Sequence, residues 1–87
     1  MTHDDLASRV GDVLAAELGL VNPPEPEDDL LADPFLLDSL DKVEIVLALQ
    51  EEFEVDITDE AADRWLAVTV TPAQFVGLVR EALGGTA

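Results

Sequence analysis

The chain has 87 residues, enough for one small domain and too few for a deep enzyme cleft. Its 20 acidic and 4 basic residues give a formal net charge of -16, which repels nucleic acid phosphates and anionic lipids and attracts basic protein surfaces. It has no cysteine, no apolar run near the roughly 18 residues of a membrane span, and no basic start typical of a secretory signal. We therefore expect a single domain over residues 1–87, a cytoplasmic monomer that binds neither nucleic acid nor membrane.

The first predicted element is a helix from about Asp4 to Leu18. Thr2 and Asp5 form a plausible capping pair at its start, and Gly19 is a suitable residue to end it. Its apolar residues recur at helical spacing: Leu6, Val10, Val13, Leu14 and Leu18.

A long surface loop follows this helix. Three prolines and four acidic residues between Val21 and Asp29 exclude a helix there. Asp33-Pro34 indicates a turn inside the loop. We expect five apolar residues to anchor the loop on the helices: Leu30, Leu31, Phe35, Leu36 and Leu37.

The second helix is predicted to begin near Asp38-Ser39 and to end near Phe53 or Glu54. It carries two apolar stripes on different faces, although one is enough to fill a core. The stripe assigned to the core contains Ile45, Val46, Leu49 and Phe53. The other contains Leu40, Val43 and Leu47, with Asp41, Glu44 and Glu51 beside it.

A short third helix is predicted over Glu60 to Trp65, capped by Thr58 or Asp59. The stretch from Leu66 to Val70 fits either a loop or a short extended run, because its β-branched residues oppose a helix. We interpret Trp65 as a core residue, with a role in shaping a substrate pocket as the alternative.

The last helix has the clearest start. Thr71 is its predicted N-cap, Pro72 occupies the first helical position and Gln74 completes a capping box. Gly84-Gly85 ends it. The pattern as a whole predicts an all-α protein of four helices.

The motif Asp38-Ser39-Leu40 needs its context, because a serine at a helix start is usually only a cap. Here it opens an acidic helix with a surplus apolar stripe. The stretch from Asp38 to Phe53, continuing through Asp56 to Ala62, resembles the acyl carrier protein family. The resemblance implies a four-helix bundle with a long loop between its first two helices and a short third helix. One departure is Leu36-Leu37, where the family usually has Gly-Ala.

The resemblance also implies a function. Ser39 would receive a 4'-phosphopantetheine arm from coenzyme A, attached by a phosphopantetheinyl transferase. The arm would carry acyl intermediates as thioesters for fatty acid or polyketide synthesis. Asp38 matches the acid used near the transferase metal, and helix capping is its alternative role. The protein itself would hold no metal.

Partner enzymes with basic patches would read the second helix. The residues that match the family's partner-binding positions are Leu40, Asp41, Val43, Glu44, Leu47 and Glu51. For the apolar three, the alternative is a contact with the long loop, and for the acids it is a solvated face.

Other readings stay open. An amino-acid carrier, peptidyl or D-alanyl, shares the fold and the arm, and an unmodified acidic helical adaptor would lack the arm. We predict that the chain is not an enzyme, because it has no Ser-His-Asp set and no phosphate-cradling glycine loop, and its only histidine is His3.

Overall fold

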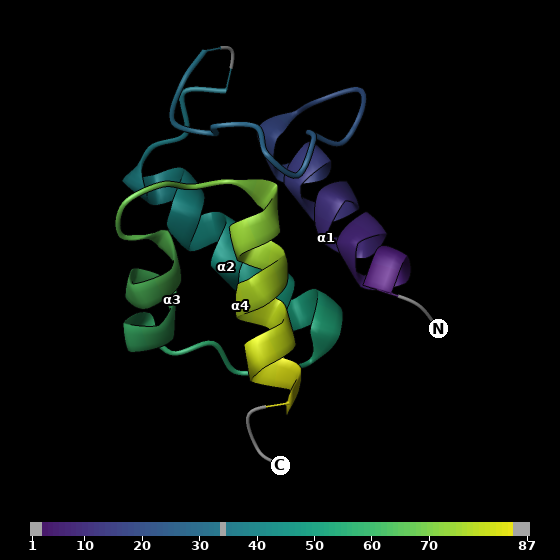
Figure 1. The fold of residues 1–87 in the computed structure, drawn as a ribbon, viewed down its shortest axis with the longest axis vertical. Helices are drawn as coiled ribbons and strands as arrows, with labels where there is room; N and C mark the ends of the chain where they lie inside the picture. The colour runs from purple at the N-terminus through teal and green to yellow at the C-terminus, as the bar shows by residue number, and fades with distance from the viewer. Residues whose placement is uncertain (1–2, 34, 85–87) are drawn as a thin grey trace.

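The computed structural model describes residues 3–33 and 35–84, with His3 and Asp4 described by their backbone alone. This part of the chain forms four helices, α1 (His3–Leu18), α2 (Ser39–Phe53), α3 (Asp59–Leu66) and α4 (Pro72–Gly84), and contains no strand (Figure 1). The predicted all-α fold with a short third helix is therefore confirmed. Thr2, Pro34 and Gly85, which the sequence analysis placed in a cap, a turn and a helix end, lie outside the described residues.

The end of α1 follows the sequence prediction closely. Gly19 adopts a left-handed conformation with φ of +69°, which glycine reaches without a steric cost. The N–H of Leu20 donates to the carbonyl of Ala15 at 2.8 Å, and so satisfies one of the last free carbonyls of the helix. The chain then leaves the helix and enters the long loop.

The starts of α3 and α4 follow the predicted caps in part. The Thr58 hydroxyl accepts the N–H of Ala61 at 3.0 Å, so Thr58 is the cap of α3. The Thr71 hydroxyl accepts the N–H of Gln74 at 3.3 Å, as expected. The predicted capping box is wrong, however, because the Gln74 Oε1 accepts the hydroxyls of Thr69 and Thr71, at 2.9 and 3.1 Å, rather than the backbone N–H of Thr71. The Gln74 side-chain NH2 donates to the carbonyl of Trp65 at 2.7 Å. The end of α3 supplies an acceptor that the sequence did not reveal.

One hydrophobic core joins the four helices. α1 packs against α2 and α4, and α4 packs against α3, whereas α3 barely touches α2. Each fully buried aliphatic or aromatic side chain contributes about 1.5–3 kcal/mol to folding. The largest of them are Val10, Leu14, Leu30, Ile45, Leu49, Val70, Phe75, Leu78 and Val79.

The long loop between α1 and α2 crosses one end of the bundle (Figure 1). Buried Leu30 fixes it there, and its N–H donates to the carbonyl of Val70 at 2.9 Å. The N–H of buried Leu37 donates to the carbonyl of Leu30, also at 2.9 Å. These bonds place the residues just before α2 against the connection between α3 and α4.

Two of the five predicted loop anchors are wrong, since Leu31 and Leu36 are exposed. The N–H groups of Phe35 and Leu36 both donate to the carbonyl of Ala32 at 3.0 Å, which closes a tight turn. Leu36 has φ of 49°, a left-handed conformation that is unfavourable for a leucine. The turn directs apolar side chains away from the core, close to the start of α2.

Candidate functional site

The start of α2 is built by two aspartates on either side of Ser39. The Asp38 carboxylate accepts the N–H of Asp41 at 2.8 Å, and the Asp41 carboxylate accepts the N–H of Asp38 at 3.2 Å. This reciprocal pair is a capping box, so Asp38 fills the capping role that the sequence left open for it. The Asp at the third helical position carries the signal for this box, which the sequence analysis missed.

Ser39 is the first residue of α2, and it is exposed. Because Asp38 caps the helix, the Ser39 hydroxyl is not needed as a cap. Exposed N–H groups and the positive end of the helix dipole favour an anion at such a position. The fold therefore offers a free hydroxyl where a phosphate group is tolerated.

The surplus apolar stripe of α2 faces solvent. Leu40, Val43 and Leu47 are 64%, 55% and 51% exposed. The acids beside the stripe differ among themselves, because Glu44 and Glu51 are exposed whereas Asp41 is half-buried in the capping box. The six predicted partner-binding residues thus lie on one side of α2, and Asp41 has a structural role as well.

A groove of about 700 Å³ opens between α2 and α3, where the two helices are least closely packed. Ser39 and Val46 are both among its lining residues. Its remaining lining residues are Lys42, Val43, Leu47, Gln50, Ile57, Asp59, Ala62, Asp63, Leu66 and Ala67. The sequence analysis gave Lys42 no role, although its spacing of one turn from Ser39 places both residues on the same side of the helix.

Trp65 is a core residue rather than a lining residue of this groove. It is partly buried and packs against the core, and its ring lies against Gly77 of α4. A Cβ at Gly77 would lie 2.5 Å from the ring, so only glycine permits this approach. The indole N–H is buried and has no hydrogen-bond partner among the described residues. Trp65 therefore sets the packing of α3 on α4.

These features define a class of protein: a small helical carrier that presents a hydroxyl at a helix start, beside an exposed apolar stripe. Residues 8–80 match the family described as "Phosphopantetheine attachment site". The acyl carrier protein of Buchnera aphidicola subsp. Baizongia pistaciae (strain Bp) is 34% identical over 64 residues, which cover 74% of this chain and 82% of that protein. The chain belongs to the acyl carrier protein family.

Membership in this family makes the chain a carrier rather than a catalyst, with a covalent phosphopantetheine attachment site. It implies interaction with a phosphopantetheinyl transferase and with synthase enzymes in general. None of the helices in the described part of the chain combines the length and the apolar character that crossing a bilayer requires.

Proposed function

We propose that Ser39 holds the 4'-phosphopantetheine arm, and that the protein carries acyl intermediates on it as thioesters. The observation that carries this proposal is the exposed hydroxyl at the first position of α2, which the Asp38 cap leaves free. The groove beside Ser39 and the exposed stripe of α2 support it, because a carrier needs room for its cargo and a surface for its partners.

Attachment transfers the phosphopantetheine group from coenzyme A to the Ser39 oxygen. The Ser39 oxygen bonds to the phosphorus of coenzyme A that bears the pantetheine, the phosphoanhydride bond breaks, and the nucleotide part leaves. The hydroxyl proton passes to a base of the transferase, whose metal ion neutralises the developing charge. Asp38 is placed next to the reacting oxygen and is exposed, so we propose that it also approaches that metal.

A mass measurement tests the attachment site. The purified protein is incubated with coenzyme A, magnesium and a broad-range phosphopantetheinyl transferase. We expect the intact mass to rise by one phosphopantetheine in the wild type and to stay unchanged in Ser39→Ala. Ser8→Ala is a matched control, because Ser8 is also exposed and is the only other serine of the chain. A gain in Ser39→Ala, or a loss of the gain in Ser8→Ala, would contradict the proposal.

The partner surface follows from the same helix. We propose that the exposed apolar stripe meets an apolar surface on partner enzymes, and that Asp41, Glu44 and Glu51 meet basic residues at its rim. The net charge of -16 steers such partners toward the carrier.

The groove between α2 and α3 offers an acyl chain an apolar contact surface, because seven of its twelve lining residues are apolar. Val46 lines the groove, whereas Leu49, which belongs to the same predicted core stripe, is fully buried in the core. We expect the methyl NMR signals of Val46 to shift between the holo and long-chain acyl forms. Those of Val13, which is partly buried on α1, are expected to stay in place. Equal shifts at both valines would contradict cargo in the groove.

Fatty acid and polyketide synthesis are the pathways we propose for this carrier, with an amino-acid carrier as the second candidate. Mass spectrometry of the thioester-bound cargo, released from protein isolated from its own cells, separates them. Acyl groups would support the first proposal, and aminoacyl groups would overturn it. The family match argues against an adaptor that never carries an arm.

A further inference from the structure

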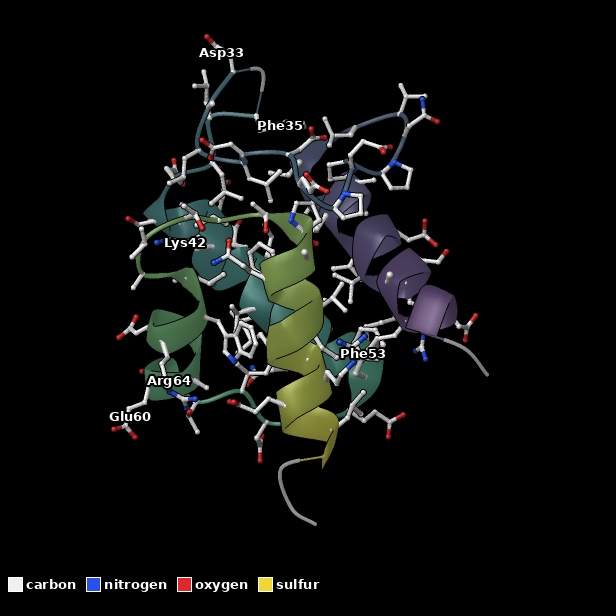
Figure 2. The ribbon with its side chains drawn as sticks, in the orientation of Figure 1. Asp33, Phe35, Lys42, Phe53, Glu60 and Arg64 are labelled. Carbon is white, nitrogen blue, oxygen red and sulfur yellow. The ribbon has the colours of Figure 1, made fainter. Side chains whose placement is uncertain are left out.

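Lys42 has an unusual place in this acidic chain. It is the only lysine among the 87 residues and the only basic residue that lines the groove beside Ser39. It lies one helical turn after Ser39, a spacing at which side chains of a helix are neighbours. Figure 2 shows Lys42 in the first part of α2, with Phe53 at the opposite end of that helix. Lys42 is half-buried and lines the groove, as is typical of a lysine whose apolar stem covers protein surface while its charge stays in contact with water.

The ammonium group of Lys42 is also available. Arg9 pairs with Glu52 at 3.0 Å, and Arg64 pairs with Glu81 at 3.2 Å. Lys42 forms no ion pair with any residue that the structure describes, although Asp59 and Asp63 line the same groove. A cation that remains unpaired in so acidic a chain is well placed to meet an added anion.

The start of α2 needs such a cation once the arm is attached. Asp38 and Asp41 already place two carboxylates on either side of Ser39. A phosphodiester on Ser39 adds a third negative charge next to them. The helix dipole offsets part of the repulsion, but its effect is confined to the first turn and is screened by salt. Among the residues that the structure describes, Lys42 is the basic residue that lines the groove together with Ser39.

We propose that the Lys42 ammonium group pairs with the phosphodiester on Ser39 and holds the first part of the arm along the groove. This inference rests on the proposed attachment at Ser39. Lys42 is then a positioning residue for the arm. Its charge determines how much attachment of the arm changes the stability of the folded protein.

A thermodynamic cycle tests the coupling. The melting temperatures of the apo and holo forms are measured for the wild type and for Lys42→Met, which keeps an unbranched apolar stem and removes the charge. Arg80→Met is the matched control: Arg80 is exposed, has no ion pair among the described residues, and lies in the second half of α4. That part of α4 lies at the opposite end of the molecule from the start of α2 (Figure 1).

We expect the change in melting temperature on modification to be about 2–4 °C less favourable in Lys42→Met than in the wild type at low salt. The difference should shrink as salt is added, and Arg80→Met should behave like the wild type. Equal changes in all three proteins would overturn the role of Lys42 and leave the attachment at Ser39 intact. A wild type that gains no arm would overturn the attachment itself, and mass spectrometry reports this separately.

A second measurement needs no variant of Lys42. Because the chain has one lysine, its side-chain NMR signals are assigned without ambiguity. We expect the ε-methylene signal of Lys42 to move when the wild type is converted from the apo to the holo form. It should stay in place when Ser39→Ala is treated in the same way. An ε-methylene signal that is identical in the apo and holo forms of the wild type would overturn the pairing.

Discussion

The two faces of α2 both carry apolar residues, but one face is buried and the other is exposed. On one face Ile45 and Leu49 are completely buried, and on the other Leu40, Val43 and Leu47 are mostly exposed. The difference lies in the neighbouring helices. α1 and α4 pack on the first face, whereas α3 packs mainly on α4 and leaves the side chains of the second face exposed. One helix thus separates the residues that hold the fold together from those that are free to meet a partner.

The largest expected effect contrasts one leucine from each face. Leu49→Ala should lower the free energy of unfolding by about 2–5 kcal/mol, since it leaves a cavity in the core. Leu47→Ala should change it by less than about 0.5 kcal/mol, because the side chain is half-exposed. Urea denaturation followed by circular dichroism measures both. Similar losses in the two variants would show that the exposed stripe has a structural role.

Partner binding is expected to reverse the order of these effects. Leu47→Ala should weaken binding of a partner enzyme about 5–30-fold, as is typical of an apolar contact at the centre of an interface. Leu83→Ala removes an equally exposed leucine from α4 and should leave the affinity unchanged. Isothermal titration calorimetry with the phosphopantetheinyl transferase gives both dissociation constants. Equal weakening in the two variants would mean that α2 is not the preferred surface.

The exposure of the second face of α2 depends on the packing of α3 against α4. Gly77→Ala places a methyl group in contact with the ring of Trp65, so it should destabilise the protein by about 1–2 kcal/mol despite a better helix propensity. Gly84→Ala is the control, because a Cβ there meets nothing. Thermal unfolding compares the two. A neutral Gly77→Ala would show that α3 shifts easily on α4.

The smallest effect concerns the strained turn before α2. Leu36→Gly should raise the free energy of unfolding by about 0.5–1 kcal/mol, because glycine adopts a positive φ without a steric cost. Glu54→Gly relieves a similar conformation, with φ of 54°, at the end of α2. If the exposed Leu36 side chain extends the partner surface, only Leu36→Gly will also weaken transferase binding. Thermal melting and calorimetry measure the two effects, and a destabilised Leu36→Gly would mean that its apolar contacts outweigh the strain.

Local signals explain why much of the fold was predictable. The helix ends at Gly19 and Thr58 depend on backbone conformation and on a hydroxyl within three residues, so neighbouring residues determine them. The two stripes of α2 follow from helical periodicity alone. The motif at Ser39 was found for the same reason, because the residues that form the start of α2, Asp38 to Asp41, are consecutive in the chain.

Long-range contacts explain what was missed. Gln74 bonds to Trp65, nine residues away, instead of closing its own capping box. Leu31 and Leu36 look like loop anchors, but a turn closed on the Ala32 carbonyl directs them outward. Val46 was assigned to the same core stripe as Leu49, but it is only partly buried and lines the groove, whereas Leu49 is fully buried.

The sequence by itself determined the four helices, the charge and the serine at the start of α2, because each depends on composition or on residues close together in the chain. Only the tertiary structure decided where the groove opens and which residues of α2 and α3 line it. Those outcomes depend on how α3 and α4 pack, and residues distant in sequence set that packing.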